Sequence, residues 1–249
     1  MKTNRNEIID LHNTDLYLYF YEDFIDTART TKECKLIIEE CELEPNAKIL
    51  DLACGHGRHS IRFAENGFAV TGIDLNTDFI ELAKKNAKEQ NLDVEFTVDN
   101  IVNINYSQQF DGIILLYNSF GFLDKQDGET LIKNISKALK PNGKIFLDIR
   151  NRDRAIKDLS DCHVMEKGKD LMIDRLSYDP KKGTTTNNRI YVKDGVRYDT
   201  PFTMQLYNYS ELQQLLAKYD LRIKKVYGHW DKHPFDAGSK RIIAVIEKE

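Results

Sequence analysis

The stretch from Ile49 to Asn76 constrains the fold of this chain more than any other part of the sequence. It joins an apolar run, a turn holding Gly55 and Gly57, a run able to form a helix, and a second apolar run that ends at Asp74. Such a strand–turn–helix–strand unit binds nucleosides. Glycines let the backbone approach the ligand, the helix N-terminus offers free N–H groups, and the terminal acid accepts hydrogen bonds from both ribose hydroxyls.

The rest of the first half continues the same alternation, from Lys48 to Ile149. A helical region at 16–43 with an apolar stripe comes first. We expect strands at 49–52, 68–73, 94–98, 110–116 and 144–149, and helices at 58–65, 77–90 and 129–139. Short buried strands joined by helices imply a parallel sheet with right-handed crossovers, which is an α/β fold.

The pattern changes after the fifth strand. Runs rich in Thr, Tyr, Val and Ile, separated by hairpin-turn sequences, predict antiparallel strands at 171–178, 184–192 and 196–206. A helix from Ser210, as its cap, to Tyr219 and strands at 221–227 and 241–247 complete the chain. We therefore divide it into N-terminal helices with a core (1–150), an antiparallel insertion (151–206), and a C-terminal helix with the last two core strands (207–249).

Composition excludes several classes of protein. The net charge of −4 argues against a nucleic-acid partner, since phosphate binding normally shows a basic surplus. No apolar run approaches the roughly 18 residues that span a bilayer, and the N-terminus lacks the apolar core of a signal peptide. The four cysteines show no CxxC spacing, so neither a metal site nor a disulfide framework is indicated. We expect a cytoplasmic protein.

The motif Asp51-Leu52-Ala53-Cys54-Gly55-His56-Gly57-Arg58, with Asp74 after the next strand and Asp99 after the third, resembles the class I S-adenosylmethionine-dependent methyltransferases. The resemblance covers essentially the whole chain. The insertion and the C-terminal run 206–231 resemble the small-molecule branch of that family, which includes the amino-sugar N-methyltransferases and uncharacterised bacterial and archaeal relatives. This implies a Rossmann-like, seven-stranded, mostly parallel sheet with an antiparallel last strand. An antiparallel β insertion after strand five would cover the acceptor pocket.

The resemblance also implies roles around the amino-acid part of S-adenosylmethionine. Gly55 and Gly57 would pass the backbone beneath the sulfonium, and Asp51 would orient the turn or receive the ammonium group. Arg29 on the N-terminal helix would pair with the carboxylate, and Arg58 opens the first helix of the core. In the family the first turn position is usually glycine. Ala53 stands there in this chain, and we expect alanine to be tolerated if its φ is negative.

The remaining cofactor contacts follow the ends of the next strands. Asp74 would accept hydrogen bonds from the ribose hydroxyls, and Leu75 would pack on the adenine face. Asp99 would accept from the adenine amine, with the backbone N–H of Asn100 or Ile101 at a ring nitrogen. Leu116 and Tyr117, at the end of the fourth strand, would lie beside the transferring methyl group.

Methyl transfer is an in-line displacement at a sulfonium carbon. The protein must align the lone pair of an N or O nucleophile about 3 Å from the methyl group and exclude water. A base helps only if the acceptor arrives protonated. The candidate bases are His229, His233, Tyr207 and Tyr209, with Asp231 as an orienting acid.

Several other functions compete with a small-molecule acceptor. A nicotinamide-dependent dehydrogenase would need a third glycine where Ser60 stands. Methyltransferases of nucleic-acid base amines usually carry Pro-Pro-aromatic after strand four, whereas this chain has Tyr117-Asn118-Ser119-Phe120. RNA or protein methylation and a non-catalytic S-adenosylmethionine-binding module remain alternatives. The sequence leaves open the acceptor, N against O methylation, and whether the chain is a monomer or a homodimer.

Overall fold

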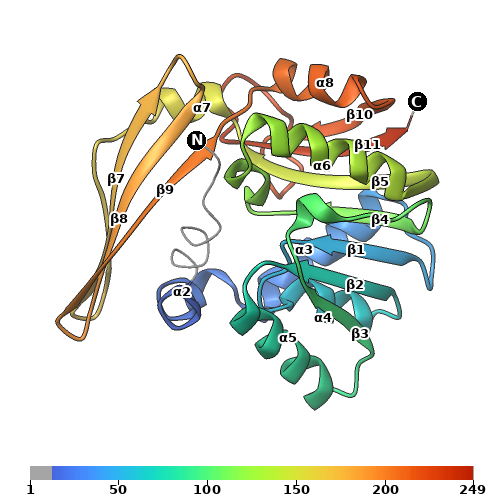
Figure 1. The fold of residues 1–249 in the computed structure, drawn as a ribbon, viewed down its shortest axis with the longest axis horizontal. Helices are drawn as coiled ribbons and strands as arrows, with labels where there is room; N and C mark the ends of the chain where they lie inside the picture. Colours follow the sequence, from blue (N-terminus) through green and yellow to red (C-terminus); the bar gives the residue numbers. More distant parts are fainter. Residues whose placement is uncertain (1–12, 249) are drawn as a thin grey trace.

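A mixed seven-stranded sheet forms the centre of the molecule (Figure 1). In the computed structural model, which describes residues 13–248, its strand order is β10-β11-β5-β4-β1-β2-β3. Neighbours among β1–β5 pair in parallel, whereas β11 runs antiparallel to both β5 and β10. This confirms the predicted fold. The strands are β1 (Lys48–Leu52), β2 (Ala69–Asp74), β3 (Val94–Val98), β4 (Phe110–Leu115), β5 (Leu139–Arg150), β10 (Leu221–Tyr227) and β11 (Arg241–Lys248).

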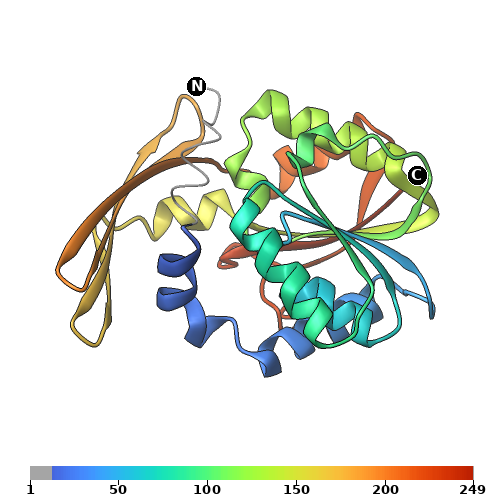
Figure 2. The same cartoon turned by 60° about the horizontal axis from the view of Figure 1, so that its bottom comes forward.

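Helices cover both faces of this sheet, so the core has three layers (Figure 2). On one face, Ile37 of α3 and Phe63 of α4 pack against Ile49 and Phe146 of the sheet. On the other face, α6 and α8 bury apolar side chains against the opposite sides of the same strands. The helices of the first face are α3 (Thr27–Glu40), α4 (Arg58–Glu65) and α5 (Thr77–Glu89), and those of the second are α6 (Lys125–Ala138) and α8 (Tyr209–Ala217).

The strand order reverses at β1, which has β2 on one side and β4 on the other. At such a switch point the connections leave toward opposite faces of the sheet, and a crevice opens beyond the carboxyl ends of the strands. Short 3-10 helices, η2 (Ile101–Asn103) and η3 (Ser119–Phe122), follow β3 and β4 at this edge. The sheet therefore directs the loops after β1 to β4 toward one place.

A separate antiparallel sheet lies beside this edge (Figure 1). It consists of β6 (His163–Lys167), β7 (Asp170–Asp179), β8 (Thr184–Lys193) and β9 (Val196–Gln205), in that spatial order. We call it the insertion sheet. The three predicted strands are confirmed within one residue at each end. Strand β6 and the short helix α7 (Arg152–Lys157), which links β5 to the sheet, were not predicted as elements.

Helix α2 (Thr14–Tyr21) packs against both the insertion sheet and helix α5 of the core. Its Phe20 ring lies 5.2 Å from the ring of Tyr191 on β8, and its Tyr17 ring lies 5.4 Å from that of Phe79 on α5. Phe20 and Tyr191 are both fully buried. The insertion sheet is thus packed onto the N-terminal part of the chain as well as joined to β5.

Several predicted helix limits were wrong, and in each case a capping side chain gives the reason. The region 16–43 divides into α2, the 3-10 helix η1 (Glu22–Phe24) and α3, because Asp26 accepts from the backbone N–H of Arg29 and starts a new helix. Helix α6 starts at Lys125, since Asp124 caps it. Helix α8 is capped by Asn208 in a capping box with Glu211, and not by Ser210.

In the described part of the chain, no helix has the length and apolar character to span a membrane.

Candidate active site

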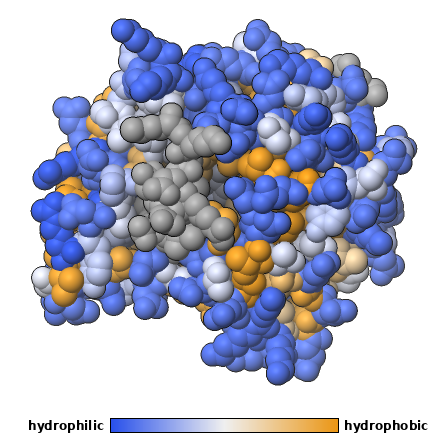
Figure 3. All heavy atoms as spheres, in the orientation of Figure 1, coloured by the Kyte–Doolittle hydropathy of each residue, from blue (hydrophilic) through white to orange (hydrophobic). Residues whose placement is uncertain are grey.

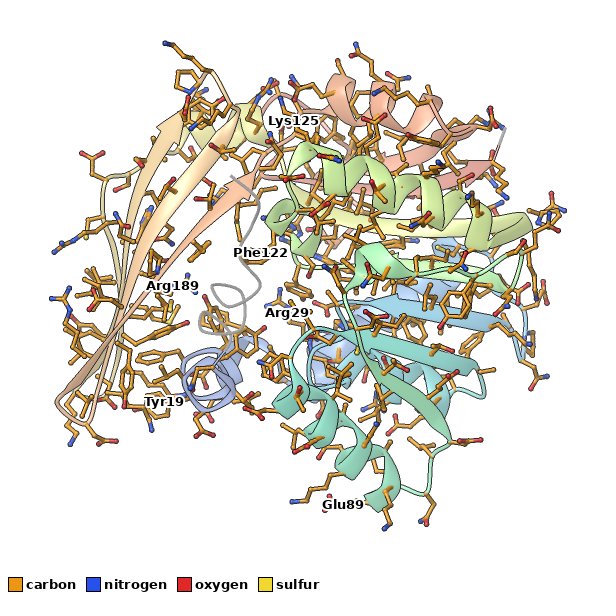
Figure 4. The ribbon with its side chains drawn as sticks, in the orientation of Figure 1. Tyr19, Arg29, Glu89, Phe122, Lys125 and Arg189 are labelled. Carbon is orange, nitrogen blue, oxygen red and sulfur yellow. The ribbon has the colours of Figure 1, made fainter. Side chains whose placement is uncertain are left out.

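A cavity of about 530 Å³ lies where the carboxyl edge of the central sheet meets the insertion sheet. This volume falls within the range of roughly 300–1,000 Å³ typical of small-molecule sites. Figure 4 shows Arg29 and Phe122 on the core side of this space and Arg189 on the insertion side. Figure 3, in the orientation of Figure 1, shows apolar surface near the middle of a mostly hydrophilic face. One cavity therefore touches both parts of the molecule.

The glycine turn after β1 forms part of the floor. A Cβ built at Gly55 would meet no atom within 4 Å, so the backbone there faces open space. Gly57 differs, because a Cβ on it would lie 2.9 Å from Ala83 and from Phe96. Gly57 has a φ of +79° and lets α4 pack closely against these residues, and it does not line the cavity. The two glycines thus serve different purposes.

Ala53 does not have the backbone conformation that we expected. Its φ is +56°, in the left-handed region, whereas the expectation that alanine is tolerated assumed a negative φ. Left-handed backbone costs an L-residue with a Cβ roughly 1–2 kcal/mol. The chain therefore holds a strained residue at the first position of its nucleoside-binding turn, where glycine would be unstrained.

Two carboxylates lie on the floor beside this turn. Asp51 is buried and accepts a hydrogen bond from Ser60 Oγ at 2.6 Å. Burial raises the pKa of Asp51 to about 7, the charge of Asp74 adds to the rise, and the Ser60 hydrogen bond opposes it. Asp74 accepts from the backbone N–H groups of Gly55 at 2.8 Å and Asn76 at 2.9 Å. The carboxylate predicted to bind the ribose is therefore oriented by the glycine turn itself.

The candidates for the adenine side separate into two groups. Leu75, Asn100, Ile101 and Leu116 all line the cavity. Asp99 is exposed, does not line the cavity, and accepts from the backbone N–H of Asn100 at 2.6 Å. Its carboxylate also accepts from Asn103 Nδ2 at 3.0 Å, so its contacts shape the turn after β3.

The side of the cavity next to α3 is organised around Glu33, which we did not predict as a functional residue. Its buried carboxylate accepts from Arg29 Nε at 2.8 Å and Arg58 Nη1 at 3.0 Å, and it also contacts His59 Nε2 at 2.9 Å. Burial alone would raise the pKa of Glu33, but the His59 hydrogen bond and the Arg58 charge outweigh it and lower the pKa to about 2. The spacing of Arg29 and Glu33, four apart on one helix, is the only sequence signal for this pair.

This cluster carries a net positive charge. Burial lowers the pKa of His59 to about 4, so the ring is neutral near pH 7. The carboxylate of Glu33 then balances one of the two guanidinium groups of Arg29 and Arg58, both of which line the cavity. The remaining charge suits a ligand carboxylate.

Tyr117, at the end of β4, joins this cluster to the central sheet. Its hydroxyl donates to the carboxylate of Glu33, and its ring lies 4.8 Å from the guanidinium carbon of Arg58. Its backbone N–H donates at 3.1 Å to buried Asp148, which is paired with Arg241. Tyr117 has a φ of +54°. Such left-handed non-glycine residues cluster at functional sites, where surrounding contacts hold them in place.

The histidines predicted as bases lie outside the cavity. The side chains of His229 and His233 are 65% and 62% exposed. His229 Nδ1 lies 3.1 Å from Asp231 and His233 Nε2 lies 3.9 Å from Asp236. The loop that carries them turns toward solvent, so their predicted catalytic role has no support from the geometry.

The two predicted tyrosines also lie elsewhere. Tyr207 is buried, with its ring 5.3 Å from that of Phe120. The Tyr209 ring stacks on Phe235 at 5.6 Å. Neither lines the cavity. The walls on that side come instead from α2 and the insertion sheet, with these lining residues: Tyr17, Tyr21, Met165, Arg189, Phe202 and Met204.

Comparison with known proteins agrees with this geometry. Residues 49–143 match a family model described as a methyltransferase domain. A putative methyltransferase of Bacillus subtilis, YqeM, is 24% identical over 234 residues, covering 92% of this chain and 94% of the relative. A solved S-adenosylmethionine-dependent methyltransferase from Clostridium acetobutylicum has the same fold, with a TM-score of 0.81 at 20% identity over 94% of this chain and 96% of that one. The solved sugar N-methyltransferase KedS8 from a Streptoalloteichus species gives a TM-score of 0.67 at 16% identity, covering 90% and 89%.

Residues 49–143 therefore form a methyltransferase domain, and the chain as a whole has the fold of a solved S-adenosylmethionine-dependent methyltransferase. Both findings agree with the family that the sequence resembles, and the chain is a methyltransferase. The matched segment 49–143 contains the strand–turn–helix–strand unit and the loops after β3 and β4.

Proposed function

We propose that this enzyme transfers a methyl group from S-adenosylmethionine to an N or O nucleophile of a small molecule held against the insertion sheet. The observation that carries the proposal is the continuity of the cavity. The same space is lined by Gly55 and Asp74 of the core and by Arg189 and Phe202 of the insertion sheet. We infer that residues 151–206 form the acceptor lid of a core that binds the donor.

The residues on the core side fit the donor by charge and shape. Open space above Gly55 admits the amino-acid part of the cofactor close to the backbone. Asp51 would receive its ammonium group, and the net positive cluster of Arg29 and Arg58 would bind its carboxylate. On the other side, Asp74 would bind the ribose, while Leu75, Asn100 and Ile101 would hold the adenine. Leu116 and Tyr117 would lie beside the methyl group.

The bound cofactor supplies an activated methyl group with a good leaving group at sulfur. The chain must therefore position the acceptor and exclude water. Tyr117 is suited to positioning, because Glu33 and Asp148 fix its hydroxyl and its backbone. The aromatic side chains of Tyr17 and Tyr21 on α2 cover the cavity and limit the access of water. Bound S-adenosylmethionine would supply the methyl group while the C–S electron pair stays on sulfur, and a neutral amine or hydroxyl held beside Tyr117 would lose its proton to solvent after the transfer.

A small acceptor is favoured over a macromolecule. The cavity lies where the central sheet meets the insertion sheet, and α2, which contacts β8 and α5, also lines it. The net charge of −4 gives no surplus of cations for a phosphate backbone. KedS8, which shares the fold over 90% of this chain, is a sugar N-methyltransferase.

Calorimetric titration with S-adenosylmethionine and with S-adenosylhomocysteine tests the donor half of the proposal. Release of S-adenosylhomocysteine in the presence of small amines, phenols and alcohols tests the acceptor half. We expect both cofactor forms to bind and at least one small acceptor to increase the release. Turnover on RNA or on a protein, with none on small molecules, would overturn the proposal, as would binding without any turnover.

A further inference from the structure

A wall of apolar and aromatic side chains lines the insertion side of the cavity. The Phe122 ring of η3 lies 5.8 Å from the Phe202 ring of β9, which in turn lies 5.3 Å from the guanidinium carbon of Arg189. That carbon lies 5.9 Å from the Tyr21 ring of α2. Met204, two residues after Phe202 on the same strand, points to the same face. All five residues line the cavity, and we call them the apolar wall.

Arg189 adds no net charge to the apolar wall. Its side chain is 11% exposed and makes two hydrogen bonds to Asp174, from Nε at 2.6 Å and from Nη2 at 2.8 Å. Burial opposes ionisation of Asp174, but the Arg189 guanidinium outweighs burial and lowers the pKa of that carboxyl. The charges of the pair therefore cancel, and a ligand on this side meets rings and a thioether.

Asp127, in the first turn of α6, is a lining carboxylate without a counter-charge. Its backbone N–H donates to the capping side chain of Asp124 at 2.8 Å. Its own carboxylate makes no hydrogen bond or ion pair with any residue of 13–248 and is partly exposed, so a ligand in the cavity can reach it. The N-terminus of a helix favours the ionised form of such a carboxylate.

The other unpaired charges of the cavity belong to its donor side. Glu33 balances one of Arg29 and Arg58, and the remaining positive charge suits the carboxylate of S-adenosylmethionine. In the proposed function, Asp51 receives the ammonium group of the cofactor and Asp74 binds its ribose. Once these groups are assigned to the donor, the acceptor is left with the apolar wall and one negative charge.

We propose that the methyl acceptor is a small organic cation, in which an apolar body of about the size of an aromatic ring carries an ammonium group that Asp127 binds. The body lies against the apolar wall, whose ring faces also attract a cation. A hydroxyl-rich amine fits less well, because the lining hydroxyl of Ser119 already donates to the carbonyl of Leu116 at 2.8 Å. This inference rests on the proposed function and specifies its acceptor.

A matched series of probes tests the inference on protein saturated with S-adenosylhomocysteine. Near pH 7, benzylamine is a cation, benzyl alcohol is neutral and benzoate is an anion, and all three carry the same ring. Calorimetry should show that benzylamine binds about tenfold more tightly than benzyl alcohol, the effect of a hydrogen bond to a charged group. Benzoate, and glucosamine with its hydroxylated body, should bind more weakly than benzylamine.

Three results of this series overturn the inference. The first is no binding of benzylamine, and the second is binding of benzyl alcohol or benzoate at least as tight as that of benzylamine. The third is equal or tighter binding of glucosamine, which would exclude the apolar body. Failure of the wild type to bind S-adenosylhomocysteine would instead overturn the proposed function.

The substitution Asp127→Asn removes the charge and keeps the shape of the side chain. Benzylamine should then bind about tenfold more weakly, and its advantage over benzyl alcohol should disappear. Asp124→Asn is the matched control, because Asp124 caps the same helix but does not line the cavity, and asparagine caps as well as aspartate does. It should leave benzylamine binding unchanged.

Unchanged benzylamine binding in Asp127→Asn, or equal losses in the two variants, overturns the inference. Weaker binding of S-adenosylhomocysteine in Asp127→Asn alone would assign this carboxylate to the donor side and would overturn the inference as well.

Discussion

The hydroxyl of Tyr117, at the end of β4, donates a hydrogen bond to the buried carboxylate of Glu33 on α3. The two residues are 84 positions apart in the chain. The contact joins the N-terminal helical layer to the strand end beside which the methyl group is transferred in our proposal. Arg29 and Arg58 share the same carboxylate, so Glu33 determines both the position of Tyr117 and the charge of this side of the cavity.

Glu33→Gln should be strongly destabilising. The substitution leaves Arg29 and Arg58 without their buried counter-charge, and breaking a buried ion pair in this way costs about 3–5 kcal/mol. Urea unfolding measures the loss. Glu39→Gln on the same helix is the control, because Glu39 is 62% exposed and pairs with the partly exposed Lys232. It should change the free energy of unfolding by less than about 1 kcal/mol. Equal effects of the two substitutions would contradict a central role for Glu33.

Asp74→Ala should weaken S-adenosylmethionine binding by about 1.5–3 kcal/mol, which is the range for hydrogen bonds to a charged group. Calorimetric titration gives the affinity. Asp99→Ala is the informative comparison, because the structure places Asp99 outside the cavity and engaged with Asn100 and Asn103. It should cost much less than Asp74→Ala. A larger loss in Asp99→Ala would restore the sequence prediction that Asp99 binds the adenine amine.

Asp51→Asn should change how stability depends on pH. The pKa of Asp51 is raised from 3.8 to about 7, so the folded protein binds the proton more tightly than the unfolded chain does. The resulting stabilisation of the wild type is complete at low pH and is lost as the pH rises from about 4 through 7. Without cofactor, the free energy of unfolding of Asp51→Asn relative to wild type should therefore increase by a few kcal/mol between about pH 5 and 8. The slope below the folded-state pKa should be about 1.4 kcal/mol per pH unit. A pH-independent difference in urea unfolding would show that the Asp51 pKa is not raised.

Ala53→Gly should stabilise the protein slightly. Glycine relieves the left-handed strain at a φ of +56°, which stabilises the folded state by roughly 1–2 kcal/mol. Glycine also increases the conformational entropy of the unfolded chain, which lowers the free energy of unfolding by about 0.4–1 kcal/mol. We expect a net gain of about 0.5 kcal/mol. Ala64→Gly within α4 is the control and should lose about 1 kcal/mol. A loss of stability in both variants would mean that contacts of the Ala53 methyl group outweigh the strain.

Local patterns predicted the donor half of this molecule well. The strand–turn–helix–strand unit is continuous in the chain, so the apolar runs, the glycines and the terminal acid were enough to place β1, α4 and β2 within one residue. The same patterns could not reveal the left-handed φ of Ala53, because the conformation follows from the course of the whole turn. Glu33 was missed because its partners Arg58 and Tyr117 come from distant elements.

The acceptor half was predicted less well, for a related reason. His229 and His233 belong to a loop after β10, at the expected end of the sheet, but the path of a loop is not encoded in a periodic pattern. The side chains that do line the cavity, such as Arg189 and Phe202, sit in strands whose facing direction depends on how the insertion sheet docks. Sequence could identify those strands, but not the side of the sheet that meets the cavity.

The match to the methyltransferase domain ends at residue 143, before the insertion sheet begins at His163. The insertion sheet is thus one continuous segment of the chain, and α8, β10 and β11 of the core follow it. Under the proposed function, substitutions in β8 and β9 would alter which compound is methylated without changing the residues proposed to bind the methyl donor. Exchanging the hairpin of β8 and β9 for that of a relative would then be a direct route to a new specificity on this scaffold.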